Sequence, residues 1–123
     1  MHANNLLSFV SPKGAIIHAP KEGTLIHGTL RSVDLIDTYV EAVKDTPEYN
    51  RMKKSSDSAL REALQNLGED YDEYAPFWDT DDAAILADDL ADILDTHAPA
   101  GTYFGAHPGD GSDFGFWPEE FLN

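Results

Sequence analysis

The sequence predicts an α+β fold, in which an antiparallel sheet built from N-terminal strands and a C-terminal hairpin packs against about three central helices. Short apolar runs separated by turn residues fill both ends of the chain, whereas the apolar residues between them recur at helical spacing. With 123 residues and 41% hydrophobic side chains, residues 1–123 suit one domain with a substantial core.

The N-terminal part predicts three strands joined by two turns. Apolar runs at residues 6–10, 15–18 and 24–30 are separated by the segments SPKG (11–14) and PKEG (20–23). The first segment has proline in its second position and glycine in its fourth, as type I turns favour, and the second again combines proline with a final glycine.

Three helices are expected in the middle. Ser32 is the expected N-cap of the first, which ends before Pro47 because the residue preceding a proline avoids the helical conformation. After a polar stretch at 48–58, which holds the basic cluster of the chain, a second helix is expected over residues 56–67. Thr80 is the expected N-cap of the third, whose apolar stripe ends at His97, where a capping or core role is expected.

The last part predicts a β-hairpin. Residues 102–107 and 114–117 are rich in aromatic side chains and are separated by the glycine-rich segment 108–113.

Composition excludes several classes of function. The chain has no cysteine, and its N-terminus lacks the pattern of a signal peptide, so a cytoplasmic protein is expected. A net charge of −15 repels nucleic acid and anionic lipid, so direct nucleic-acid or membrane binding is not expected. Nucleotide-loop, dinucleotide, zinc-protease and hydrolase motifs are absent, so we expect no cofactor and no enzyme activity.

The charge is unevenly distributed along the sequence. Residues 62–123 contain no lysine or arginine but hold sixteen of the 23 acidic residues. Concentrated charge of one sign destabilises a compact chain unless a partner of opposite charge compensates it. A basic partner, such as a basic host protein, is therefore expected.

The third predicted helix carries the densest acidic row. Asp88, Asp92 and Asp95 recur at helical spacing on one face, and Asp81 lies seven residues before Asp88. Asp88, Asp92 and Asp95 cover about 10 Å of the helix axis, or one charge per about 3.5–5 Å, which approaches the roughly 3.4 Å between phosphates of one DNA strand. A solvated face that only keeps the protein soluble is the alternative.

Acidic and aromatic residues also mix just before that helix. Tyr71, Asp72, Tyr74 and Trp78 are candidates for a binding surface, with the aromatic rings as anchors. A place in the core is the alternative for these rings.

The hairpin loop holds a possible metal-binding set. His107, Asp110 and Asp113 follow an H-x-x-D-x-x-D spacing and would offer one imidazole and two carboxylates to a divalent ion if the loop curls. Gly109, Asp110 and Gly111 are equally what a tight turn requires, so we expect no metal. A small metal-dependent enzyme or binding module is the alternative function.

Residues 103–117, YFGAHPGDGSDFGFW, resemble the ending of small acidic accessory proteins of phages, plasmids and conjugative elements, and residues 28–36 are similar to the start of their first helix. The resemblance implies a mobile genetic element in a bacterial cytoplasm, where acidic DNA mimics recur among anti-defence proteins. We therefore expect a non-enzymatic acidic binding protein, of which a DNA-mimic-type inhibitor of a host nucleic-acid-binding or defence protein is one form. An accessory protein whose acidity serves only solubility is the remaining alternative.

Overall fold

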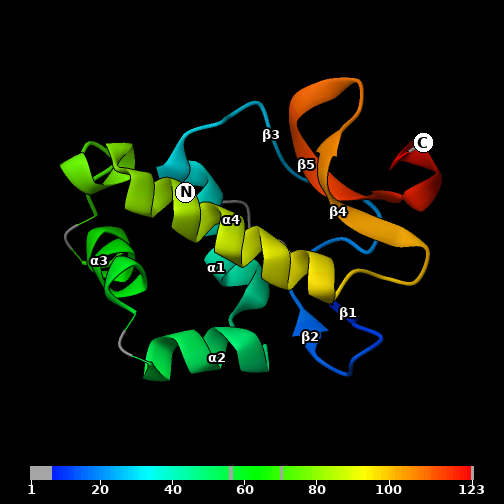
Figure 1. Ribbon diagram of the computed structural model, residues 1–123, viewed down its shortest axis with the longest axis horizontal. Helices are drawn as coiled ribbons and strands as arrows, with labels where there is room; N and C mark the ends of the chain where they lie inside the picture. Colours follow the sequence, from blue (N-terminus) through cyan, green and yellow to red (C-terminus); the bar gives the residue numbers. More distant parts are fainter. Residues whose placement is uncertain (1–6, 56, 70, 123) are drawn as a thin grey trace.

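Strands from both ends of the chain flank a helical middle in the computed structural model, which describes residues 7–55, 57–69 and 71–122 (Figure 1). The α+β class predicted from the sequence is confirmed. Residue 6, where the first predicted strand begins, and residue 56, where the second predicted helix begins, lie outside the described residues. Along the described chain, the elements are β1 (Phe9–Val10), β2 (Ile16–Ile17), β3 (Gly23–His27), α1 (Ser32–Val43), α2 (Pro47–Lys54), α3 (Ser58–Leu67), the 3₁₀-helix η1 (Pro76–Asp79), α4 (Asp81–Thr96), β4 (Thr102–His107), β5 (Asp110–Pro118) and the 3₁₀-helix η2 (Glu119–Leu122).

The strands of the described residues form two antiparallel sheets, where one sheet was expected. Strand β5 lies between β3 and β4, so the C-terminal hairpin and one N-terminal strand share a sheet. Strands β1 and β2 pair only with each other, through a turn in which Gly14 N–H donates to the Ser11 carbonyl at 2.9 Å. Directly after β2, His18 N–H donates to the Ala42 carbonyl of α1 at 3.0 Å, which turns the chain toward a helix and away from the larger sheet.

Helix α2 occupies most of the polar stretch 48–58, for which the sequence predicted no separate element. Its start has strong local signals, because Thr46 accepts a hydrogen bond from Tyr49 N–H and Pro47 occupies the first turn. Only Tyr49 of this helix is buried, so the apolar periodicity that marks most helices is missing. At α1, Arg31 is the N-cap in place of Ser32, and it makes no side-chain capping bond.

Helix α4 begins as predicted. Thr80 accepts a hydrogen bond from Ala83 N–H, and two aspartates occupy the first turn, where the helix dipole favours negative charge. One face of α4 packs along α1 and against β4 (Figure 1). The helix ends at Thr96, and His97 forms its C-cap. His97 is buried, so the capping or core role predicted for it is confirmed.

Aromatic rings connect the elements through the core. Phe116 of β5 makes edge-to-face contacts with Phe9 of β1 and Phe104 of β4, and Phe104 in turn contacts Tyr39 of α1, with centroids 5.2–5.5 Å apart. Such pairs contribute about 0.5–1.5 kcal/mol beyond the burial of their surface. None of the helices among the described residues has the length and apolar character required to cross a membrane.

Candidate functional site

The outward side of α4 carries a row of exposed carboxylates. Asp81, Asp88 and Asp92 are exposed, and Ile85 lies among them with 56% of its surface accessible. The opposite side of the helix is buried against α1 and β4, which fixes the direction in which these aspartates point. We call the set Asp81, Ile85, Asp88 and Asp92 the outer acidic face.

The carboxylates of α4 lie close enough to influence one another. Burial raises the pKa of Asp89, and the neighbouring charges of Asp92, Asp57 and Asp88 raise it further. Burial also raises the pKa of the Tyr39 phenol, with a contribution from Asp88. Among the described residues, lysine and arginine form ion pairs with Asp34, Glu41 and Glu73, and with none of the aspartates of α4.

Asp95 belongs to the acidic row in sequence but has a structural contact. One of its oxygens accepts a hydrogen bond from Phe104 N–H at 3.0 Å, which ties the end of α4 to β4. We therefore leave Asp95 out of the outer acidic face.

The segment before α4 does not form one surface. Trp78, a candidate surface anchor, is only 6% exposed and packs in the core, as the alternative interpretation has it. Its indole N–H donates to the Asp72 carbonyl at 2.7 Å, while the Asp72 carboxylate accepts from Tyr74 N–H at 2.9 Å. Asp72 thus holds the local turn.

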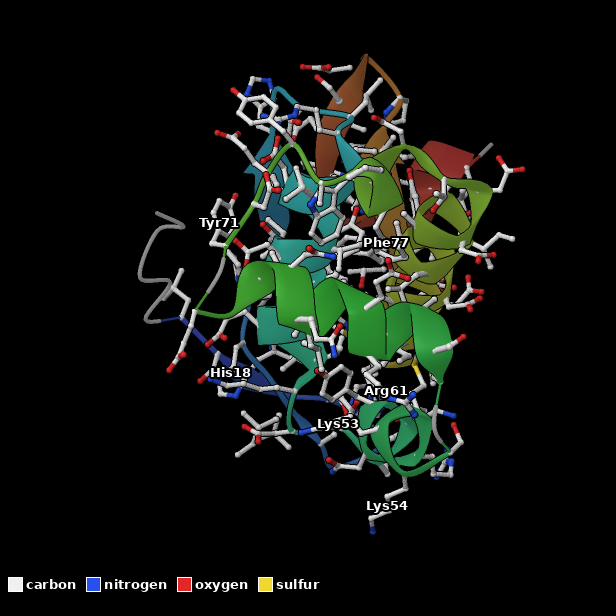
Figure 2. The ribbon with its side chains drawn as sticks, turned by 90° about the vertical axis from the view of Figure 1, so that its left-hand side faces the viewer. His18, Lys53, Lys54, Arg61, Tyr71 and Phe77 are labelled. Carbon is white, nitrogen blue, oxygen red and sulfur yellow. The ribbon has the colours of Figure 1, made fainter. Side chains whose placement is uncertain are left out.

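Tyr71 and Tyr74 are both exposed, by 52% and 80%. Burial of the Tyr71 phenol and the charges of Glu73, Asp37 and Asp34 raise its pKa, which places this ring beside acids of α1. Figure 2 shows Tyr71 on the side of the molecule away from α4. The acidic and aromatic candidates therefore divide between two faces.

The basic residues labelled in Figure 2 gather at another end of the molecule. Lys53 and Lys54 lie on α2, at the end of the molecule opposite the β4–β5 hairpin, with Arg61 of α3 nearby. The charges of the two halves are not fully separated in space, because Arg31 pairs with Glu73 at 3.1 Å.

The hairpin brings together a different histidine from the one expected. His27 of β3, Asp110 and Asp113 each offer a ligand atom, and these atoms lie within 4.8 Å of one another. The N–H and hydroxyl of Ser112 and the contact with His27 lower the pKa of Asp110, the backbone hydrogen bond contributing most. We call His27, Asp110 and Asp113 the β3–β5 cluster.

His107, which the sequence suggested for this set, points elsewhere. Its ring contacts Trp117 and Phe121 edge-to-face, with centroids 4.8 and 5.7 Å apart. Its Nδ1 accepts a hydrogen bond from Gly109 N–H at 2.9 Å, so it stabilises the hairpin turn. With Trp117 and Phe121 it also lines a cavity of about 560 Å³.

A buried network that sequence reasoning missed joins Ser11, His97 and Glu48. His97 Nδ1 lies 2.8 Å from Ser11 Oγ, and its Nε2 lies 2.7 Å from Glu48 Oε1. A carboxylate only accepts hydrogen bonds, so the Nε2 N–H of His97 donates to Glu48. The order resembles a serine–histidine–acid triad, but Ser11 is only 4% exposed and does not line the cavity beside His107.

Glu48 should make the stability of the fold depend on acid pH. Burial opposes its ionisation, but the His97 hydrogen bond, its own backbone N–H and nearby positive charge outweigh burial and lower the pKa of Glu48 below its usual 4.5. The resulting stabilisation is complete above the unfolded pKa and disappears as pH falls through the folded value. Glu48→Gln should therefore flatten the fall in unfolding free energy below about pH 5, measured by urea titration. Glu62→Gln, which changes an exposed glutamate of α3, should leave that pH dependence unchanged.

Two groups of side chains therefore have the exposure that binding requires, the outer acidic face and the β3–β5 cluster. The first can attract a positively charged surface, and the second can offer ligands to a cation. No protein-family model, curated protein or solved structure matches this chain.

Proposed function

We propose that this chain is a non-enzymatic acidic binding protein that docks its outer acidic face onto a basic, nucleic-acid-binding surface of a host protein and occludes it. The observation that carries the proposal is the exposure of Asp81, Asp88 and Asp92 along α4, in a half of the chain that has no lysine or arginine. The inhibited partner is a bacterial protein that binds DNA or RNA, including one that acts in defence.

The spacing of charge supports mimicry of a phosphate backbone. Without Asp95, five exposed aspartates lie between residues 81 and 92, a distance of about 16 Å along a helix. Three of them belong to the outer acidic face and two, Asp82 and Asp89, flank it, which gives about one charge per 3.3 Å, close to the roughly 3.4 Å between phosphates of one DNA strand. A basic groove that follows a nucleic-acid strand would meet a similar row of negative charge.

Ile85 gives the face an apolar centre. It lies one turn after Asp81 and one turn before Asp88 and Asp89, with more than half of its surface accessible. Burial of one large aliphatic side chain on binding contributes about 1.5–3 kcal/mol, whereas charges at the rim mainly increase the association rate. The face thus combines an anchor with electrostatic steering. The likeness of the hairpin to acidic accessory proteins of mobile elements supports a host-directed partner.

The triple variant Asp81→Asn, Asp88→Asn and Asp92→Asn should weaken binding while the protein stays folded. Tagged protein is incubated with a bacterial lysate, eluted with a salt gradient and analysed by mass spectrometry, and the affinity of the captured protein is then measured. With about 0.2–1 kcal/mol for each exposed charge pair, the three changes should lower affinity roughly 3- to 150-fold and reduce its salt dependence. Added duplex DNA or RNA should displace the partner.

A matched control separates local from overall charge. Glu22→Gln, Glu119→Gln and Glu120→Gln change the net charge equally at exposed positions outside α4 and should leave affinity nearly unchanged. Equal weakening by both triple variants, or a partner that binds this chain and nucleic acid simultaneously, would contradict occlusion by α4.

A further inference from the structure

The β3–β5 cluster is assembled by the register of the sheet. His27 and Asp113 are directly paired residues of the antiparallel strands β3 and β5. Directly opposite residues in such a pair project on the same face. Asp110 is the first residue of β5 and lies at the start of the same hairpin arm, where its Oδ2 is 2.9 Å from His27 Nε2. Residues more than eighty positions apart thus converge.

Neighbouring side chains hold both carboxylates in place. Thr24 Oγ1 donates to Asp113 Oδ1 at 2.7 Å, and the N–H and hydroxyl of Ser112 both donate to Asp110 Oδ1 at 3.0 Å. Gly28 N–H also donates to the Ser112 carbonyl at 3.0 Å, so the strands are tied together beside the cluster. Hydrogen bonds of this kind orient metal-binding carboxylates in known sites.

We propose that His27, Asp110 and Asp113 bind one divalent transition-metal ion of the Zn²⁺ or Mn²⁺ type. An imidazole nitrogen with two carboxylate oxygens suits these ions better than Mg²⁺ or Ca²⁺, which prefer oxygen ligands alone. Ligand atoms within 4.8 Å need only a small inward movement to reach an ion at about 2.0–2.2 Å from each. Water completes the coordination, because the side chains of His27 and Asp110 are exposed.

Metal binding would join β3 to the tip of the β4–β5 hairpin. The ion replaces the single hydrogen bond between His27 and Asp110 with bonds to three residues. Because this cluster belongs to β3 and β5 and not to α4, metal binding is independent of the outer acidic face.

The test is calorimetric titration of the full chain with ZnCl₂ and, separately, MnCl₂ at neutral pH. We expect saturable binding of one ion per chain by at least one metal. His27→Gln and Asp113→Asn should weaken it on the order of 100-fold, and Thr24→Val, which removes only the orienting bond to Asp113, about tenfold. His107→Gln is the matched control, because this histidine lies in the same hairpin but outside the cluster, and it should bind as tightly as the unchanged protein.

Two further measurements make the result specific. In histidine NMR spectra, substoichiometric Mn²⁺ should broaden the His27 ring signals before those of His107. The triple Asn variant of the outer acidic face should retain full metal affinity. No saturable binding of either metal, or binding that is equally strong in His27→Gln, would overturn the proposal, and circular dichroism of each variant verifies that it is folded.

Discussion

Gly115→Ala should destabilise the protein by about 3 kcal/mol or more, because its added methyl group would collide with the backbone of β3. A Cβ atom at position 115 would overlap the Gly23 carbonyl oxygen and lie 2.7 Å from the Gly23 carbonyl carbon and 2.9 Å from Thr24 Cα. Backbone atoms cannot rotate away as a flexible side chain can. Strand β3 would therefore have to move away from β5. The collision lies where Thr24 pairs with Gly115, next to the register shift between Thr24 and Ile26.

Equilibrium urea unfolding measures this loss, and Gly111→Ala is the control on the same strand. A Cβ atom at Gly111 would have no neighbour within 4 Å, so its effect should stay within about 0.5 kcal/mol. Movement of β3 would also separate His27 from Asp113, so Gly115→Ala should lose metal affinity in parallel. A Gly115→Ala variant as stable as Gly111→Ala would show that β3 and β5 are not paired in this register.

The sequence indicated the elements whose local signals agree with their packing. Helix α4 has a capping threonine, acidic first-turn residues and a continuous apolar stripe, and each of these lies in the sequence itself. Helix α2 has good caps but only Tyr49 in the core, so its periodicity was too weak to read. Its stability comes from tertiary contacts, including those of Tyr49, which no local pattern contains.

The metal-ligand candidates show the same limit. Spacing within the hairpin suggested His107, but alternation and a register shift turn that ring toward Trp117 and Phe121. His27 takes its place through pairing across β3 and β5. That pairing depends on which N-terminal strand joins the hairpin, and the sequence did not distinguish β3 from β1 and β2. Ile85 lies outside the buried stripe of α4, and a single apolar residue among aspartates gives no periodic signal in the sequence.

His97→Ala should destabilise the fold by about 3 kcal/mol, because it removes a buried ring and leaves two polar partners without it. His97 is 1% exposed and joins three parts of the chain: the β1–β2 turn through Ser11, α2 through Glu48, and the end of α4. Asn and Gln can each replace one ring nitrogen as a hydrogen-bonding group, so His97→Asn and His97→Gln should lose less than His97→Ala. His18→Ala is the control, since the side chain of this more accessible histidine bonds to the exposed Asp45 and its loss should cost less than about 1 kcal/mol.

A double-mutant cycle decides whether the network or the lost volume causes the effect. If the hydrogen bond between Ser11 and His97 matters, Ser11→Ala should destabilise the native protein by more than it destabilises the His97→Ala variant, with a coupling of about 0.5–3 kcal/mol in urea unfolding. Purely additive losses would mean that the bond to Ser11 contributes nothing and that His97 acts through its volume or through Glu48. Coupling would instead identify a buried polar contact between residues 86 positions apart as one that holds the N-terminal hairpin against the helices. The hairpin strands have only two residues each, so their own pairing contributes little to keep them in place.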